Sequence, residues 1–315
     1  MALNSTSIGW INGDKPLSPI QKIAYYALNW LNNVLPSVSS ESSVAIKNFR
    51  CPRLRDRWHS LETKSSPSRK LSDLFWQELP WQKIGEELGA IHILDVGCGA
   101  GGYGAKLEKW SFGKISSYTG VDIAYHKNWP KLEEQNLNFK FRKLQVEDIS
   151  NHIPAGTNFF MSQSAIEHFP QDLLFFQALR QNIIAYQKPV IQVHLFPSAA
   201  CLRAYRLHGV RQYTPRTVGK ITSLFRAFSY STLFRLGGQR CNSLHYQFIS
   251  KPLLIQNGVD WRESKTEEYE KEAFKAIERD MQNPSGAPSF YALVIHSYWR
   301  QKIIEQDAWP SQKLN

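Results

Sequence analysis

Ile91-His-Ile-Leu-Asp-Val-Gly-Cys-Gly-Ala-Gly-Gly-Tyr-Gly104 is the stretch that decides the fold. Its first six residues, Ile91–Val96, are a short apolar run that ends at glycines, and a helical pattern follows over Ala105–Trp110. A short apolar run bounded by glycine is typical of a buried strand. The stretch therefore predicts a strand, a glycine-rich turn and a helix, which is how a nucleotide-binding βαβ unit begins.

The charge beside the turn narrows the choice of ligand. Gly97, Gly99 and Gly102 match the G-x-G-x-x-G pattern of dinucleotide folds, so the glycines alone do not name the cofactor. Asp95 stands two residues before the first of them. A pyrophosphate above this turn would be repelled by a carboxylate, whereas a cationic ligand would be attracted. The amino group and the sulfonium of S-adenosylmethionine meet that requirement.

The composition is that of an ordinary globular protein. The chain has 315 residues, 42% of them hydrophobic and 21% charged, which fits one large domain with additions or two small domains. No apolar run approaches the roughly 20 residues of a membrane span, and residues 1–7 lack the pattern of a signal peptide. We therefore expect a cytoplasmic protein without a membrane span, with peripheral membrane association left open.

Cysteine spacing and net charge add two further expectations. The four cysteines share no C-x-x-C spacing, so neither a zinc site nor a disulfide framework is indicated. The net charge of +11 fits an anionic partner, such as nucleic acid, a membrane surface or an acidic glycan. It equally fits a basic surface that only improves solubility.

Beyond the glycine turn, helix and strand patterns alternate. This order predicts a parallel sheet with helices on both faces, whose ligands gather at the carboxyl ends of the strands. Apolar residues at helical spacing over 20–35 predict a helix packed on the main domain, with a lid or a surface-seeking helix as alternatives, and residues 36–70 read as irregular chain. The further strands are expected at Ser117–Ile123, Asn138–Leu144, Asn158–Gln163, Pro189–Leu195, Ser229–Arg235 and Ser289–His296.

Acidic and polar side chains follow the strands of this sheet. Asp122 ends the second strand, where a carboxylate can accept both ribose hydroxyls, and Glu147 and Asp148 follow the third, where they can hold an adenine amino group. The Glu167–His168 pair follows the fourth strand and can place a base near the reacting group. Each of these residues also has a structural interpretation as a helix cap, a turn residue or a hydrogen-bonding partner.

The four strand ends together carry a family resemblance. Over residues 91–196, four motifs resemble in their order the motif series of class I S-adenosylmethionine-dependent methyltransferases. They are D-V-G-C-G-x-G, G-V-D-I, V-E-D-I and S-x-S-A-I-E-H-F. The resemblance implies S-adenosylmethionine as cofactor, S-adenosylhomocysteine as product, and a Rossmann-like seven-stranded sheet in the order 3-2-1-4-5-7-6 with its last strand antiparallel. The cofactor-binding residues that it implies are Asp95, Gly97, Gly99, Gly101, Asp122, Ile123, Glu147, Asp148 and Gln163.

A narrower resemblance concerns the substrate. Leu71–Trp81 and the run His208-Gly-Val-Arg-Gln-Tyr213 look similar to bacterial methyltransferases found with surface-polysaccharide genes, which implies O-methylation of a sugar. Arginine guanidinium groups bind carboxylates and phosphates through paired hydrogen bonds, and aromatic rings stack on sugar faces. An acidic sugar or glycan end is therefore the expected partner, with a basic helix docked on the sheet as the alternative. The predicted substrate-binding residues are Arg203, Arg206, His208, Arg211 and Tyr213.

A sugar hydroxyl is weakly acidic and needs a base in the transition state. His168 is the first candidate, followed by His194, His208 and Glu167. No triad of carboxylates that could bind a metal stands out in the sequence, so we expect no metal and an activity that survives chelators.

We expect the chain to divide into three parts with different roles. Residues 1–88 form a helical and irregular extension that packs on the core or covers it as a lid, residues 89–200 form the cofactor-binding core, and residues 201–315 complete the sheet and carry a helical insertion on the substrate side. A methyltransferase for another anionic small molecule or for nucleic acid and a non-catalytic binding module remain alternatives. Nucleic acid is the less expected substrate, because the fourth strand is followed by neither N-P-P-Y nor D-P-P-Y. The oligomeric state stays open.

Overall fold

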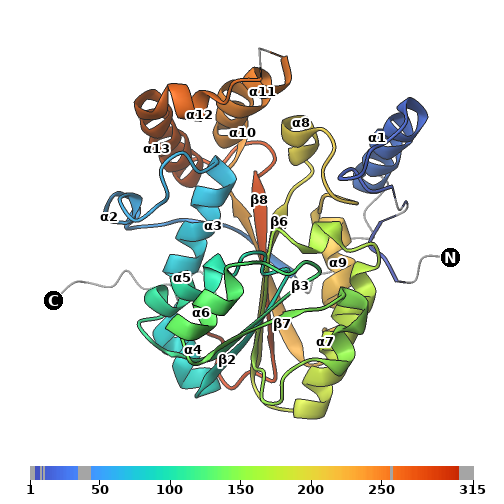
Figure 1. Ribbon diagram of the computed structural model, residues 1–315, viewed down its shortest axis with the longest axis vertical. Coiled ribbons are helices and arrows are strands. Elements are labelled where there is room, and N and C mark those ends of the chain that lie inside the picture. The colour runs from blue at the N-terminus through green and yellow to red at the C-terminus, as the bar shows by residue number, and fades with distance from the viewer. Residues whose placement is uncertain (1–3, 8, 10, 35–43, 256–257, 305–315) are drawn as a thin grey trace.

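The centre of the protein is one eight-stranded sheet (Figure 1). The computed structural model describes residues 4–7, 9, 11–34, 44–255 and 258–304. The strands lie in the order β1-β7-β8-β6-β5-β2-β3-β4. Their bounds are β1 (Val44–Asn48), β2 (Ile91–Val96), β3 (Ile115–Asp122), β4 (Phe139–Lys143), β5 (Phe159–Gln163), β6 (Val190–Pro197), β7 (Ser229–Leu236) and β8 (Phe290–Ser297).

The α/β class predicted from the sequence is confirmed, but the sheet is larger than predicted. It has eight strands instead of seven, so the strand order over the whole sheet differs from the expected one. The additional strand is β1, which pairs in parallel with β7 inside a stretch that the sequence indicated as irregular. Counted from β2 onward, the other seven strands run 3-2-1-4-5-7-6, and β8 is antiparallel to both β6 and β7.

Helices cover both faces of the sheet because side chains alternate along each strand. Ile93 belongs to a core with α3, α4, α5, α10 and α13, and its neighbour Leu94 to a second core with α7 and α9. The α-helices are α1 (Pro19–Val34), α2 (Leu54–Trp58), α3 (Pro67–Glu78), α4 (Trp81–Leu88), α5 (Gly102–Trp110), α6 (Trp129–Gln135), α7 (Asp172–Tyr186), α8 (Cys201–Tyr205), α9 (Pro215–Ser223), α10 (Gln239–His245), α11 (Lys251–Ile255), α12 (Trp261–Ser264) and α13 (Thr266–Gln282). The 3-10 turns η1 (Val146–Asn151) and η2 (Ile166–His168) and the π turn η3 (Tyr246–Ser250) complete the set.

Local sequence explains where two of the helices begin. The Ser66 side chain accepts a hydrogen bond from the backbone N–H of Arg69, and Pro67 opens α3 with its preset φ. Thr214, the N-cap residue of α9, and Thr217 exchange hydrogen bonds in a capping box. As in α3, a proline occupies the first helical position. These caps fix the first residues of α3 and α9, which pack in the two different cores.

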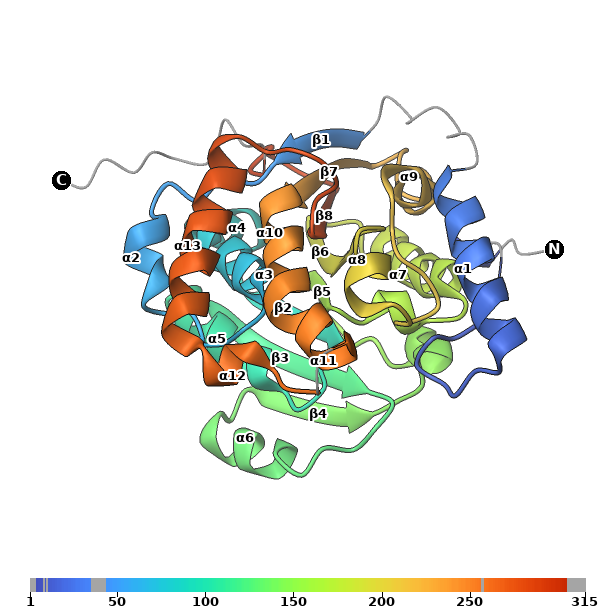
Figure 2. The same cartoon turned by 90° about the horizontal axis from the view of Figure 1, so that it is seen from above.

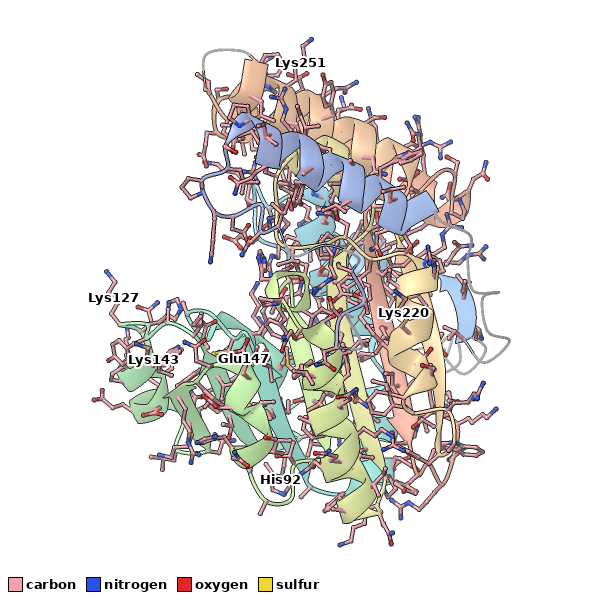
Figure 3. All side chains as sticks on the ribbon, turned by 90° about the vertical axis from the view of Figure 1, so that its right-hand side faces the viewer. His92, Lys127, Lys143, Glu147, Lys220 and Lys251 are labelled. Carbon is pink, nitrogen blue, oxygen red and sulfur yellow. The ribbon has the colours of Figure 1, made fainter. Side chains whose placement is uncertain are left out.

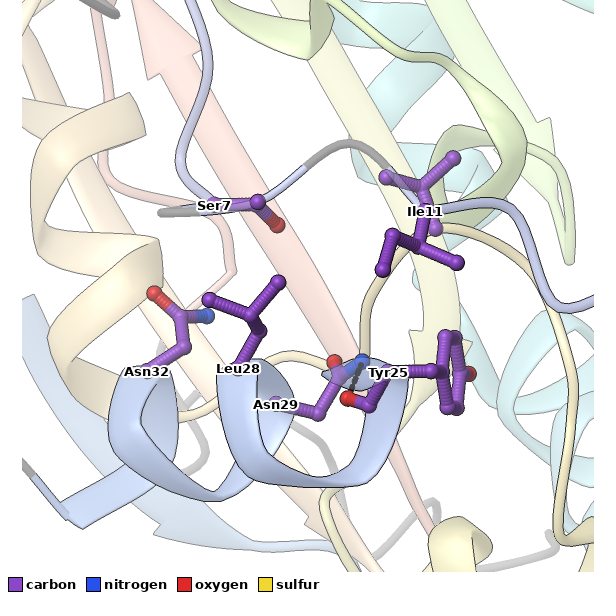
Figure 4. A pocket seen from close by; sticks show the side chains of 8 residues that line it. Ser7, Ile11, Tyr25, Leu28, Asn29 and Asn32 are labelled. Atoms are coloured by element: carbon purple, nitrogen blue, oxygen red, sulfur yellow. Dashed lines mark hydrogen bonds between the residues drawn. The ribbon is translucent and has the colours of Figure 1, made fainter. Parts of the chain in front are cut away.

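Helix α1 lies on the domain in a different orientation from the one predicted. Ile20, Ile23 and Trp30 of the apolar stripe are 79%, 70% and 61% exposed. The buried face is the one with Tyr25, whose hydroxyl donates to the carbonyl of His208 (2.8 Å). Figure 4 shows this face beside a cavity of about 10 Å³, lined by Ser7, Ile11, Tyr25, Leu28, Asn29 and Asn32 among others.

None of the helices in the described ranges combines the length and the apolarity that crossing a membrane requires. The cytoplasmic location and the peripheral association stay predictions.

The turn after β2 is fixed by a close approach to the segment after β5. Gly97 has a φ of 79°, and a Cβ added there would lie 2.3 Å from the Cβ of Ala165. A side chain at this position would therefore meet both an unfavourable backbone conformation and an overlap. The glycine lets the turn lie directly against the carboxyl end of β5.

Gly97→Ala should destabilise the protein by about 2–5 kcal/mol, the sum of the left-handed backbone cost and an overpacking cost. The matched control is Gly156→Ala, because Gly156 has a φ of 81° and nothing within 4 Å of an added Cβ. It should lose only about 1–2 kcal/mol. Urea unfolding measures both variants, and equal losses would contradict the role given to Ala165.

Candidate functional site

A cavity of about 440 Å³ opens at the carboxyl ends of the parallel strands. Gly97, Asp122, Ile123, Glu147 and His168 all line it, and they come from four successive strand ends. In Figure 3, Glu147 lies toward the end of the sheet that is nearer to the blue helix α1. His92 lies toward the other end, where β2 begins. The structure thus brings together residues that the sequence placed there by strand order.

Hydrogen bonds to the end of β3 hold the glycine turn. The backbone N–H groups of Gly97 and Cys98 both donate to the carbonyl of Val121 (2.8 and 3.0 Å). The N–H of Gly99 donates to Oδ2 of Asp122 (2.8 Å). Of the three predicted glycines, Gly97 lines the cavity, whereas Gly99 and Gly101 are not among its lining residues and shape the turn with positive φ angles of 53° and 82°.

Asp122 keeps capacity for a ligand. Besides the bond from Gly99, its Oδ1 accepts a hydrogen bond from the N–H of Ala124 (3.0 Å). Each oxygen of an ionised carboxylate offers two lone pairs, so each can accept one more hydrogen bond. Asp122 is therefore both a cap for the turn and a free acceptor in the cavity wall.

Asp95 is buried beneath the turn with one oxygen unpaired. Its Oδ2 accepts a short hydrogen bond from the hydroxyl of Tyr118 (2.5 Å), and its Oδ1 has no hydrogen-bond partner in the described chain. Burial raises the pKa of Asp95 to about 7, while the bond from Tyr118 lowers it and the charge of Asp122 raises it further. A cation close to this carboxyl would favour its ionised form.

The other predicted cofactor-binding residues form two groups, those that line the cavity and those that do not. Glu147 and Ile123 line the cavity, and Ile123 presents an exposed apolar surface there. Asp148 and Gln163 are not among the lining residues. The amide of Gln163 is instead held by α3, since its Oε1 accepts a bond from the indole N–H of Trp76 (2.9 Å). The next residue, Ser164, takes its place in the cavity wall.

Two histidines and two carboxylates meet beside the cavity. Nδ1–H of His168 donates to Oδ2 of Asp14 (2.6 Å), and the ring of His208 packs edge-on against that of His168, with centroids 4.9 Å apart. Glu167 lies buried between them. Burial by itself would lower the pKa of His208, but the facing carboxylates of Glu167 and Asp14 raise it overall.

His194 does not belong to this site, which corrects its prediction as a base. It is fully buried in β6, with Nδ1 bonded to the hydroxyl of Ser162 (2.8 Å) and its ring against Phe175 and Phe176. Burial lowers the pKa of His194 to about 3. The residue is a neutral member of the core.

Arg211 and Tyr213 are also corrected, because both are fully buried and bonded inside the protein. The guanidinium of Arg211 donates to the carbonyls of Ile166, Phe169 and Pro170 and to the hydroxyls of Ser5 and Ser7. Tyr213 donates its hydroxyl to Oδ2 of Asp172 (2.9 Å). Arg206 is exposed, and the side chain of Arg203 lies outside the described residues.

Several site residues escaped the sequence interpretation. Asn12 and Lys15 line the cavity, and Asp14 holds His168. Trp129 donates its indole N–H to the carbonyl of Gly99 (2.9 Å) and stacks on Phe141. For Asn12, Asp14 and Lys15, the only signal in the sequence is the turn-forming run Asn12-Gly-Asp14, which does not indicate what these residues contact.

Solved structures similar to this chain include three methyltransferases. A SAM-dependent methyltransferase from Archaeoglobus fulgidus is 19% identical over 69% of this chain and 90% of its own, with a TM-score of 0.41. A putative sarcosine dimethylglycine methyltransferase from Galdieria sulphuraria is 17% identical over 72% and 85%, with a TM-score of 0.44. The plantazolicin methyltransferase BamL, in complex with a triazolic desmethylPZN analog and SAH, is 14% identical over 78% and 90%, with a TM-score of 0.42. No protein-family model and no curated protein matches the sequence.

Arg211→Met should lower the free energy of unfolding by about 3–5 kcal/mol, because it leaves Asp172 and three carbonyls buried without their cation. The control is Arg142→Met, since Arg142 is exposed on the edge strand β4 and its loss should change stability by about 0.5 kcal/mol at most. Both are measured by urea denaturation. A change below about 1 kcal/mol for Arg211→Met would contradict its structural role.

Proposed function

We propose that this protein is an S-adenosylmethionine-dependent methyltransferase that transfers the methyl group to a hydroxyl oxygen of a sugar, with an acidic unit of a bacterial surface polysaccharide as the acceptor. The observation that carries the proposal is the single cavity in which Gly97, Asp122, Ile123, Glu147 and His168 converge. Its volume of about 440 Å³ falls within the usual range of small-molecule sites.

The residues of the cavity fit this cofactor part by part. The free lone pairs of Asp122 suit the two ribose hydroxyls, and Glu147 suits the exocyclic amino group of adenine. The exposed side chain of Ile123 offers an apolar contact for the base. Asp95 does not line the cavity, but its carboxyl, with one unpaired oxygen, lies buried beneath the glycine turn, where it can attract the positively charged methionine end.

When bound, the cofactor supplies a methyl group on a sulfonium that is already activated for displacement. The protein therefore has to align an acceptor oxygen with that group and to receive its proton. His168 is in position for the second task because it lines the cavity and its Nδ1 is held by Asp14. Glu167 and His208 surround the opposite nitrogen of the same ring.

A second cavity supports a sugar as the acceptor. It has a volume of about 610 Å³ and lies between α8 and α10, which are side by side above the sheet (Figure 2). Its lining carries no charged residue and combines four alanines with five neutral polar side chains, which can hydrogen-bond to sugar hydroxyls. The lining includes Gln239, Asn242, Ser243, Tyr246 and Gln247.

Tyr205 of α8 packs between two histidines, one of the Glu167 and His168 site and one of α10. The ring of Tyr205 lies 5.4 Å from His208 and 4.6 Å from His245 of α10, centroid to centroid. The acidic character of the acceptor is supported by Lys15 in the cofactor cavity and by the exposed Arg206 after α8. Arg211 no longer supports it, since its guanidinium is bonded within the protein.

The direct experiment measures transfer of labelled methyl from S-adenosylmethionine to acidic sugars, nucleotide-sugars, capsule and lipopolysaccharide extracts, and total RNA. We expect label in the glycan fractions and its loss in Asp122→Asn, which keeps the shape of the side chain but removes a ribose acceptor. Lys127→Gln, an exposed residue beyond the same strand, serves as the control. Label in RNA alone would overturn the sugar acceptor, and tight cofactor binding without any transfer would favour a binding module.

The raised pKa of Asp95 gives a second test, through the pH dependence of cofactor binding. The ionisable groups around Asp95 are Tyr118, Asp122 and Cys98. In the free protein Asp95 keeps its proton up to about pH 7, whereas an unfolded aspartate loses it near pH 4. Asp95 therefore makes the folded state less stable as the pH rises between these values.

A cationic ligand binds the ionised carboxylate, so its affinity should rise with pH below about 7 by up to about tenfold per unit. Calorimetry of S-adenosylmethionine binding between pH 5.5 and 7 measures this rise, and Asp95→Asn should remove it. The same slope in wild type and variant would contradict the contact between Asp95 and the methionine end.

A further inference from the structure

Three ligand-type side chains from distant parts of the chain meet beside the cofactor cavity. Glu167 and His168 lie on η2, and His208 lies in the loop after α8. Each offers one nitrogen or oxygen atom that lies within 4.8 Å of the other two. We call these three residues, together with Asp14, the Glu–His cluster.

Glu167 is the feature of the cluster that needs explaining. Its side chain is 0% exposed, and neither carboxylate oxygen has a hydrogen-bond partner among the described residues. The nearest polar groups are Nε2 of His168 at 3.8 Å and Nε2 of His208 at 3.7 Å, both beyond hydrogen-bond distance. A buried carboxylate without partners costs several kcal/mol unless a cation compensates it.

The backbone holds Glu167 at this place. The N–H of Val210 donates to the carbonyl of Glu167 (2.8 Å), and Gly209 lies so close that a Cβ on it would be 2.8 Å from the same oxygen. The N–H of Gly209 donates in turn to Oδ1 of Asp14 (2.9 Å). The spacing between Glu167 and the two histidines is therefore set by the fold.

Asp14 fixes which nitrogen of His168 faces Glu167. A carboxylate only accepts hydrogen bonds, so the 2.6 Å contact places the proton of His168 on Nδ1. Nε2 is then left with its lone pair toward Glu167. His208 is oriented in the same sense, with Nε2 toward Glu167 and Nδ1 3.9 Å from Asp14. Metal-binding histidines show this arrangement, in which a carboxylate behind the ring orients it.

We propose that the Glu–His cluster binds one divalent transition-metal ion through Nε2 of His168, Nε2 of His208 and the carboxylate of Glu167, with Asp14 as the residue that orients His168. Two ligands at about 2.1 Å from an ion lie at most about 4.2 Å apart. The contacts of Glu167 with the two histidines, at 3.8 and 3.7 Å, satisfy this limit. All three ligand atoms lie within 4.8 Å of one another, so the side chains need at most a small shift to close on an ion. Two imidazoles and one carboxylate favour manganese, iron, cobalt or zinc over magnesium or calcium.

Three protein ligands leave coordination positions open. His168 lines the cavity, so an ion held by it lies in the cavity wall. If the proposed function holds, an open position would take the acceptor oxygen and lower its pKa, and His168 would then act as a ligand and not as the base. Metal binding itself is independent of that step and is tested without it.

The test uses the untagged full chain after dialysis against a chelator, with Co²⁺ as the probe. We expect one Co²⁺ per chain by equilibrium dialysis, together with a visible absorption band that reports the ligand field. Glu167→Gln, His168→Gln and His208→Gln should each lose the band. Asp14→Asn should keep the band but bind about 10- to 100-fold more weakly. The control is His152→Gln, because His152 is an exposed histidine that follows η1 and does not belong to the cluster, so the change should leave binding unaltered.

Two outcomes would overturn the proposal. One is wild-type protein that takes up no Co²⁺, which would leave the cluster as a group of ion-paired histidines. The other is uptake that the three ligand variants do not change. Because Glu167 is buried, thermal unfolding checks that each variant is folded, and the partly exposed His208 provides a ligand variant in which the substituted side chain is not itself fully buried.

Binding of S-adenosylmethionine to the metal-free protein is measured beside each titration. Co²⁺ binding without cofactor binding would overturn the proposed function alone. Cofactor binding without Co²⁺ binding would overturn the metal site alone.

Discussion

The buried guanidinium of Arg211 is the interaction on which the candidate site depends. All five of its N–H donors are used: three go to carbonyls of the segment after β5, and two go to serine hydroxyls near the N-terminus. Asp172 lies 3.5 Å away and supplies the opposite charge. A buried arginine is tolerated only when its hydrogen bonds are satisfied, and here they are. Because Glu167 and His168 lie within the segment that it ties down, Arg211 sets their position without touching any ligand.

The N-terminal segment is held by the same set of bonds. Thr6 donates both its backbone N–H and its hydroxyl to Asp172, and Gly13 and Gly209 are joined backbone to backbone. These contacts bring Asn12, Asp14 and Lys15 to the cavity and to the histidines. One wall of the site is thus made by the beginning of the chain, far in sequence from the strands that carry the other walls.

This division explains what the sequence could predict. Asp122, Ile123 and Glu147 follow strands directly, and parallel strands bring their carboxyl ends to one edge, so alternation alone placed these residues in one cavity. The roles of Arg211 and Tyr213 could not be read in this way, because residue type does not say whether a guanidinium faces solvent or backbone carbonyls. For the same reason the sequence did not predict β1, which forms a strand by pairing with β7. It also did not predict that the apolar stripe of α1 is exposed, because the hydrogen bonds of Tyr25 fix the orientation of this helix.

The two halves of the crevice therefore differ in how they are built. The cofactor half consists of residues attached to the sheet, whose positions follow from strand geometry and from the close contact between Gly97 and Ala165. The half with the Glu–His cluster consists of loops joined by contacts of long sequence separation, such as those of Asp14 with His168 and Gly209. Loops can change without disturbing a sheet. A protein built like this can keep the half of the crevice that is attached to the sheet while the N-terminal segment and the loop after α8 change, so under the proposed function substrate specificity should reside in these two segments.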